Sequence, residues 1–174
     1  MVKTEYNRNA FKTGDLVVWS TRGIKSIRDL QLQVVRFMTR SEYDHVGIVV
    51  EMNNRLFVVE ATPPRVRLYP LSKMLPLYHL PLSLDVTQEE VNDLFSHIGE
   101  EYSVWQAFVS YFTKPKEDNK WQCVEFCDHW YREVMGFDIE HDYTPSGFVL
   151  SMMRYSQSGL RYYVSDTMRG SSNV

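Results

Sequence analysis

Apolar residues follow two different periods along the chain. Over most of the first 80 residues they form short segments rich in Val, Ile and aromatic residues, separated by Gly, Asn and Pro. Segments of this kind are typical of β-strands bounded by turns. We therefore predict a β-rich first half, with strands over residues 15–19, 45–51, 56–61, 65–69 and 77–80.

Helical spacing replaces this pattern at several places. Thr87 and Glu90 have the spacing of a capping box, an apolar stripe follows them, and Gly99 supplies a stop signal. Gly136 ends another helical stretch, and Thr144 before Pro145 offers an N-cap and a first-turn proline. We predict helices over residues 24–38, 88–98, 104–111, 123–135 and 145–153, and hence an α+β fold.

One predicted hairpin has a readable register. The strands over 45–51 and 56–61 flank Asn53 and Asn54, a turn sequence. Antiparallel pairing about that turn places residues whose numbers sum to about 107 opposite each other. His45 then lies near Thr62 and diagonal to Glu60, so we expect His45 and Glu60 to be neighbours on one face.

Length and composition fit one globular domain. The chain has 174 residues, 44% of them hydrophobic, which is enough for a substantial core. We place this core at about residues 11–153 and expect a polar tail from about residue 162 to 174, flexible or bound to a protein partner. The formal net charge is −3 without long charged blocks, which argues against nucleic-acid binding.

The start of the chain is polar, and no apolar run is long enough for a membrane span. We therefore expect no signal peptide, no transmembrane segment and a cytoplasmic protein. The only cysteines, Cys123 and Cys127, lie four residues apart on one predicted helix, where a strain-free disulfide is improbable. Reduced thiols fit an intracellular compartment.

Cys123 is the strongest candidate for chemistry. It lies where a helix is predicted to begin, and the N-terminal amides and dipole of a helix stabilise a thiolate and an oxyanion. Cys127, one turn later, is expected to face the core. The alternative for either residue is a small buried hydrophobe without chemistry.

His45 and Glu60 supply the other parts that a cysteine nucleophile needs. A carboxylate among apolar strand residues is costly to bury without a partner, and orienting an imidazole is one such role. A structural histidine at a strand end is the alternative for His45. The other histidines are weaker candidates, and no Cys-x-x-Cys or His-x-x-x-His spacing appears, so we expect no metal site and no cofactor.

Four segments in this order resemble a known family. They are Phe11–Val17, with its Gly-Asp pair; Ser41–Val49, around His45; Val59–Ala61, around Glu60; and Gln122–Phe126, around Cys123. Gly99–Tyr102 also resembles a Gly-x-x-Tyr segment found ahead of the cysteine helix. The chain resembles the circularly permuted NlpC/P60-like, papain-related proteins, in the group that includes YiiX-like proteins and a poxvirus relative.

The resemblance implies a permuted papain-like fold, with an antiparallel or barrel-like sheet against helices and the nucleophile at a helix N-terminus. It implies Cys123 as nucleophile, His45 as general base and Glu60 as the group that orients His45. Permutation explains why His45 and Glu60 precede the cysteine. Lecithin:retinol acyltransferase-like proteins share this order but typically have another histidine in place of Glu60.

A cysteine hydrolase or acyltransferase that cleaves an amide or ester through a thioacyl intermediate is the function expected. Candidate substrates are peptides, peptidoglycan-like fragments and acyl lipids, with Tyr43, Tyr102 and Trp121 as candidate substrate-binding residues. The alternative is a non-catalytic binding or structural module on the same scaffold, such as a phage or viral particle component, which would be virion-associated.

Overall fold

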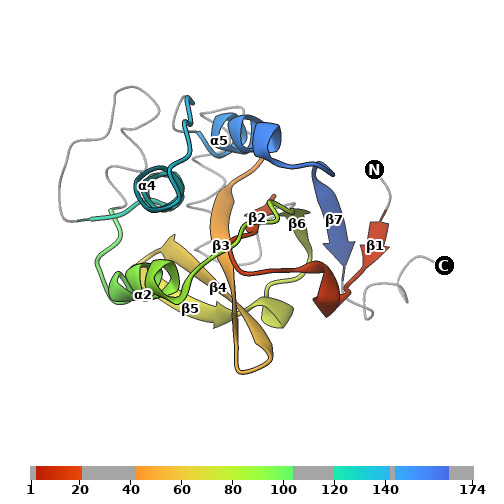
Figure 1. Ribbon diagram of the computed structural model, residues 1–174, viewed down its shortest axis with the longest axis horizontal. Coiled ribbons are helices and arrows are strands. Elements are labelled where there is room, and N and C mark those ends of the chain that lie inside the picture. Colours follow the sequence, from red (N-terminus) through yellow and green to blue (C-terminus); the bar gives the residue numbers. More distant parts are fainter. Residues whose placement is uncertain (1–2, 21–41, 104–119, 142–143, 165–174) are drawn as a thin grey trace.

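A seven-stranded sheet forms the body of the molecule (Figure 1). The computed structural model describes residues 3–20, 42–103, 120–141 and 144–164. The strands lie in the order β1-β7-β6-β2-β3-β4-β5. Their bounds are Lys3–Glu5 (β1), Leu16–Trp19 (β2), His45–Met52 (β3), Arg55–Thr62 (β4), Arg65–Pro70 (β5), Leu77–Leu80 (β6) and Arg161–Val164 (β7).

The six strands from β7 to β5 are antiparallel to their neighbours, and only β1 pairs in parallel, with β7. The predictions of an α+β fold and of an antiparallel sheet are therefore confirmed. Each of the five predicted strands is present within a residue or two of its predicted bounds.

The described part of the chain holds three α-helices: Gln88–Ser96 (α2), Cys123–His129 (α4) and Pro145–Met152 (α5). Helix α4 packs against β3, β4 and α5, which places its first residue at the sheet. Figure 1 shows α4 and α5 along one side of the sheet. The helices predicted over 24–38 and 104–111 lie outside the described residues. Within the described ranges no helix is both long and apolar enough to span a bilayer.

The capping predictions for α2 and α5 are confirmed. The Glu90 carboxylate accepts a hydrogen bond from the Thr87 amide at 2.6 Å, and the Thr87 hydroxyl accepts one from the Glu90 amide. The Thr144 hydroxyl caps α5 in the same manner, at 3.0 Å from the Gly147 amide. Helix α2 ends at Ser96 rather than at residue 98, because the chain turns toward β5, where the Gly99 amide donates to the Val66 carbonyl.

Two strands were not predicted from the sequence. β7 pairs with β6, and β1 pairs with the other edge of β7, so both termini of the described chain belong to the sheet. The predicted core of residues 11–153 therefore left out part of the fold, and the predicted tail begins inside β7. β1 has only three residues, too few to show an alternating pattern, and its partner lies far away in the sequence.

The cysteine helix also differs from the continuous α-helix predicted through Met135. After His129 it widens into a π-helical turn over Trp130–Val134, and the Met135 amide donates to the Trp130 carbonyl at 3.1 Å. This wider turn accompanies the burial of two consecutive bulky side chains, Trp130 and Tyr131.

Apolar side chains of the sheet divide into two buried clusters. The larger one joins β2, β3 and β4 to the apolar side chains of α4 and α5. The smaller one gathers around Phe11, Leu71 and Leu77. Neighbouring β3 residues belong to different clusters, because successive side chains of a strand point to opposite faces: Ile48 belongs to the first cluster and Val49 to the second. The central strands are thus buried on both faces, and any polar side chain there requires a partner.

Candidate functional site

The β3–β4 hairpin places His45 beside Glu60. Paired residues in the ladder, from Ile48 with Val59 to Met52 with Arg55, have numbers that sum to 107, as the sequence predicted. Asn53 and Asn54 both have positive φ, which is the conformation of a tight two-residue hairpin turn. In this register His45 is diagonal to Glu60, and the His45 Nε2 and Glu60 Oε2 atoms form a short hydrogen bond.

A glycine makes room for this contact. A Cβ on Gly47 would lie 3.3 Å from the Glu60 Cβ and only 2.6 Å from a Val58 methyl group. The φ of Gly47 is not in the left-handed region, so space rather than backbone conformation requires a glycine here. The Glu60 side chain thereby passes over β3 toward His45.

Glu60 is completely buried and shares its two oxygens between two partners. Oε2 contacts His45, while Oε1 accepts hydrogen bonds from Arg67 Nε at 2.7 Å and from an Arg67 terminal nitrogen at 2.5 Å. Burial raises the pKa of Glu60, but His45 and Arg67 together outweigh burial and lower it to about 2. The carboxylate is therefore ionised at neutral pH.

His45 is buried at the start of β3 and interacts with two groups. Burial lowers the pKa of His45. The charge of Glu60, the hydrogen bonds to Cys123 and Glu60, and the charge of Cys123 outweigh burial and raise this pKa to about 10. Because Nε2 is bonded to Glu60, Nδ1 is the ring nitrogen left for the thiol. A protonated imidazole between a carboxylate and a thiol is suited to stabilising a thiolate.

Cys123 is the first residue of α4, as predicted, and is 7% exposed. Its helix starts after Gln122, whose backbone N–H donates to the Glu125 carboxylate at 3.4 Å. This contact gives Glu125 a structural role at the helix N-terminus. The helix N-terminus presents backbone N–H groups that have no partner within the helix.

Cys127 is completely buried one turn further along α4, as expected. Burial, followed by the nearby Cys123 and Asp128, raises the pKa of its thiol well above the ordinary value. An uncharged thiol in this environment is a poor nucleophile. The two cysteines are both free, so the helix carries two thiols in contrasting surroundings.

The three aromatic residues predicted to bind substrate occupy different places. Trp121 lies two residues before Cys123, and its indole N–H donates to Glu100. Tyr102 forms a bridge to Trp121 and links that segment to the edge of β5. Tyr43 packs edge-on against Tyr78, with ring centroids 5.3 Å apart, close to the start of β3. Substrate contact by any of the three stays a prediction.

Sequence reasoning missed two residues beside His45 and Glu60. Arg67 lies directly opposite Glu60 in the β4–β5 ladder, and Trp19 lies opposite His45 in the β2–β3 ladder. The Trp19 ring is 5.4 Å from the His45 ring, between centroids, and its N–H donates to the Met74 carbonyl. Extending the hairpin logic to the strand after Pro63 and Pro64 would have identified Arg67, because pairs in that ladder sum to 127.

Asp15, in the Gly-Asp segment, has a structural role. Its carboxylate accepts hydrogen bonds from the Lys12 and Leu82 amides and contacts His79 Nε2 at 2.8 Å. His79 is fully buried and stacks on Phe11. This pair connects β6 to the segment before β2 and gives His79 a structural role.

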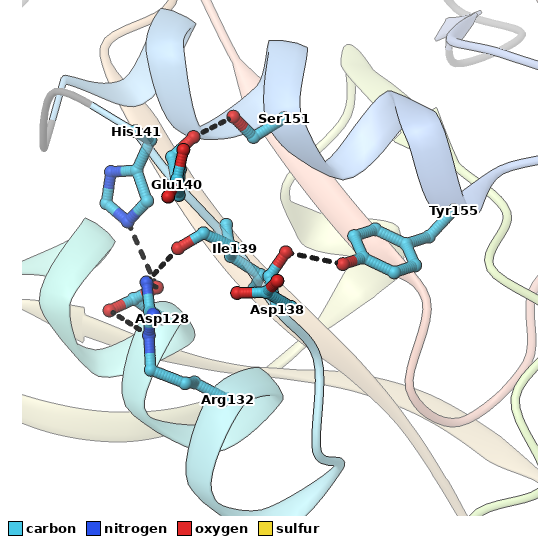
Figure 2. Close-up of polar contacts among 8 residues, drawn as sticks. All are labelled: Asp128, Arg132, Asp138, Ile139, Glu140, His141, Ser151 and Tyr155. Carbon is cyan, nitrogen blue, oxygen red and sulfur yellow. Dashed lines mark hydrogen bonds and ion pairs between the residues drawn. The ribbon is translucent and has the colours of Figure 1, made fainter.

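A further polar cluster joins α4 and the π-helical turn after it to residues 138–141 (Figure 2). Asp128 contacts His141 Nε2 at 3.0 Å and Arg132 at 3.2 Å, and Arg132 also donates to the Ile139 carbonyl. The Tyr155 hydroxyl donates to the Asp138 carbonyl at 2.6 Å. These contacts fix residues 138–141 against α4 and the end of α5, as Figure 2 shows.

Comparisons with known proteins identify the fold alone. No protein-family model matches the chain, and no curated protein matches its sequence. Among solved structures it is similar to the crystal structure of the metalloprotein YiiX from Escherichia coli O157:H7, with a TM-score of 0.56 and 18% identity. The similarity covers 91% of each chain. The chain therefore has a YiiX-like α+β fold.

Proposed function

We propose that the protein is a permuted papain-like cysteine hydrolase or acyltransferase that acts on an amide or ester bond. The observation that carries the proposal is the position of His45, which bonds to Glu60 through Nε2 and interacts with the Cys123 thiol. Nucleophile, base and orienting carboxylate are the parts of a thiol catalytic triad. Their order, with His45 and Glu60 ahead of Cys123, fits the permuted arrangement.

The first half of the reaction forms a thioacyl-enzyme. In the reactive pair the thiol proton already resides on His45, and the Cys123 sulfur attacks the substrate carbonyl carbon, so that a C–S bond forms and the carbonyl oxygen becomes an anion. Backbone N–H groups at the start of α4 stabilise this anion. When the intermediate collapses, the C–N or C–O bond breaks and His45 gives its proton to the leaving amine or alcohol.

In the second half, water or an acceptor alcohol or amine attacks the thioacyl carbon. His45 removes the proton of the attacking group, the C–S bond breaks, and the Cys123 thiol is restored. Attack by water completes hydrolysis, and attack by another acceptor completes acyl transfer. Glu60 stays ionised throughout and keeps Nε2 of His45 oriented, so that Nδ1 faces the sulfur.

Peptides, peptidoglycan-like fragments and acyl lipids are the substrate classes we propose to test first. The name of the structural neighbour calls that protein a metalloprotein. In the described ranges of this chain, no three His, Cys, Asp or Glu side chains are grouped to hold a metal ion. The proposed mechanism is written with Cys123, His45 and Glu60.

Thiol reactivity tests the proposal before any substrate is known. We would measure iodoacetamide labelling of Cys123 and Cys127 from pH 4 to pH 9 by peptide mass spectrometry, in the parent and in His45→Ala. We expect fast labelling of Cys123 at mildly acidic pH, loss of that reactivity in His45→Ala, and slow labelling of Cys127. Equal, slow labelling of both cysteines, unchanged in His45→Ala, would favour the non-catalytic binding module.

A positive result would justify a panel of amide and ester substrates. Cys127→Ala is the matched control, because it removes the neighbouring thiol from the same helix and leaves the proposed triad intact. Cys123→Ala should abolish all turnover that Cys127→Ala retains.

A further inference from the structure

Arg67 is a cation in direct contact with the proposed catalytic carboxylate. It lies on β5 directly across from Glu60, and two of its nitrogens donate to the same carboxylate oxygen, Oε1. The other oxygen, Oε2, is thereby left for His45. Arg67 thus determines which oxygen of Glu60 faces the imidazole.

Arg67 also contacts an aromatic ring. Its guanidinium lies 4.8 Å from the centre of the Tyr69 ring, which is on the same face of β5 two residues further along. The Arg67 side chain is 35% exposed, whereas the Glu60 side chain is fully buried. A planar guanidinium that stacks on a ring and donates through two nitrogens is more strongly oriented than an ammonium group.

We propose that Arg67 is a positioning residue of the site, which acts through Glu60 to hold His45 in register with Cys123. The inference rests on the proposed function, since it gives Arg67 a role only if Cys123 is the nucleophile. Arg67 is separated from the thiol by both Glu60 and His45, so it orients the reacting groups without contacting them.

The charged and titratable groups around Glu60 define what loss of Arg67 would change. They come from three elements: His45 from β3, Arg67 from β5, and Cys123 and Cys127 from α4. Without Arg67, burial of Glu60 is opposed by His45 alone. The pKa of Glu60 should therefore rise, and its carboxylate should be free to rotate, which weakens the hold on His45.

The test is the pH profile of Cys123 alkylation by iodoacetamide in the full chain, with Arg67→Met and Arg67→Lys. We expect Arg67→Met to reduce the plateau rate several-fold and to move the acidic limb of the profile to higher pH. The limb should move because a His45 that Glu60 holds less firmly stabilises the Cys123 thiolate less well. Arg67→Lys should restore most of the acidic limb and part of the plateau, since it keeps the charge but loses the second hydrogen bond.

Arg65→Met is the matched control, because Arg65 is an exposed arginine on the same strand and pairs with Thr62 rather than with Glu60. Its profile should coincide with that of the parent. A second comparison uses Glu60→Gln. If Arg67 acts through Glu60, Arg67→Met should add little to the effect of Glu60→Gln, whereas an equal further loss in that background would overturn the inference.

The possible failures are distinguishable. If parent Cys123 reacts slowly and independently of His45, the proposed function fails and the role of Arg67 fails with it. If parent Cys123 is reactive but folded Arg67→Met has the parent plateau and the parent acidic limb, only the role of Arg67 fails. Circular dichroism verifies folding. If Arg67→Met does not fold, the alkylation profile of Arg67→Lys decides whether Arg67 has this role.

Discussion

Gly47 leaves the space through which the Glu60 side chain crosses the hairpin, since a Cβ at this position would lie 3.3 Å from the Glu60 Cβ and 2.6 Å from Val58. We expect Gly47→Ala to destabilise the fold by about 1–3 kcal/mol, the usual cost of overpacking. It should also slow Cys123 alkylation, because Glu60 and His45 shift apart. Urea unfolding and the alkylation rate measure the two effects.

The clash with Val58 provides a control for the Gly47 prediction. In the double variant Gly47→Ala/Val58→Ala, the added methyl group occupies space that Val58 has vacated. The double variant should be more stable than the sum of the two single effects implies. Strict additivity would contradict a steric cause.

The His45–Glu60 pair should make the free energy of unfolding fall at both acidic and alkaline pH. The pKa of Glu60 falls from 4.5 to about 2 on folding, so its contribution is present above pH 4.5 and is lost as the pH falls toward 2. The pKa of His45 rises from 6.5 to about 10, so its contribution is present below pH 6.5 and is lost as the pH rises toward 10. The stability difference between the parent and Glu60→Gln should therefore be largest between pH 4.5 and pH 6.5. Urea titrations at acidic, intermediate and alkaline pH measure it, and a difference independent of pH would show that the pair does not carry this charge.

The two cysteines should respond differently to truncation. Cys127→Ala removes a sulfur from the core and should cost about 1 kcal/mol of stability, a typical value for a single substitution, with the reactivity of Cys123 retained. Cys123→Ala should leave stability nearly unchanged and remove turnover. Thermal unfolding and labelling of the remaining thiol separate the two. A Cys127→Ala protein that is folded but unreactive would contradict the assignment.

Asp15 and His79 should matter for folding rather than for chemistry. Asp15→Ala leaves a buried imidazole and two backbone amides without their acceptor. Each buried donor that loses its acceptor costs about 1–3 kcal/mol. We expect a large fall in thermal stability, with Cys123 alkylation unchanged at temperatures where the variant is folded. Loss of reactivity in the folded variant would assign Asp15 a part in the site.

Local sequence signals determined the central hairpin and the helix starts. Asn53 and Asn54 fixed the hairpin register, and Thr87 with Glu90 fixed the start of α2, because these features depend on residues a few positions apart. His45 could be placed beside Glu60 for the same reason. The start of α4 at Cys123 was likewise predictable from the pattern around it.

Features that depend on distant partners were not predictable in this way. β1 and β7 are strands because they find each other at the sheet edge, not because of an alternating pattern. Arg67, by contrast, lies only seven residues from Glu60 and was missed because the register of the β4–β5 ladder was not worked out from the turn at Pro63 and Pro64. The π-helical turn after His129 was also missed, because the spacing of apolar residues does not show where a helix widens.

The two-residue turn at Asn53 and Asn54 sets the length of the hairpin as well as its direction. The turn is exposed and distant in sequence from Cys123, a location where insertions are usually tolerated. Here a single inserted residue that displaces the pairing by one position would turn the β4 side chains to the opposite face of the sheet. Glu60 would then point away from His45. The surface turn therefore tolerates changes of residue better than changes of length, and a natural or engineered insertion there would act as a mutation of the site.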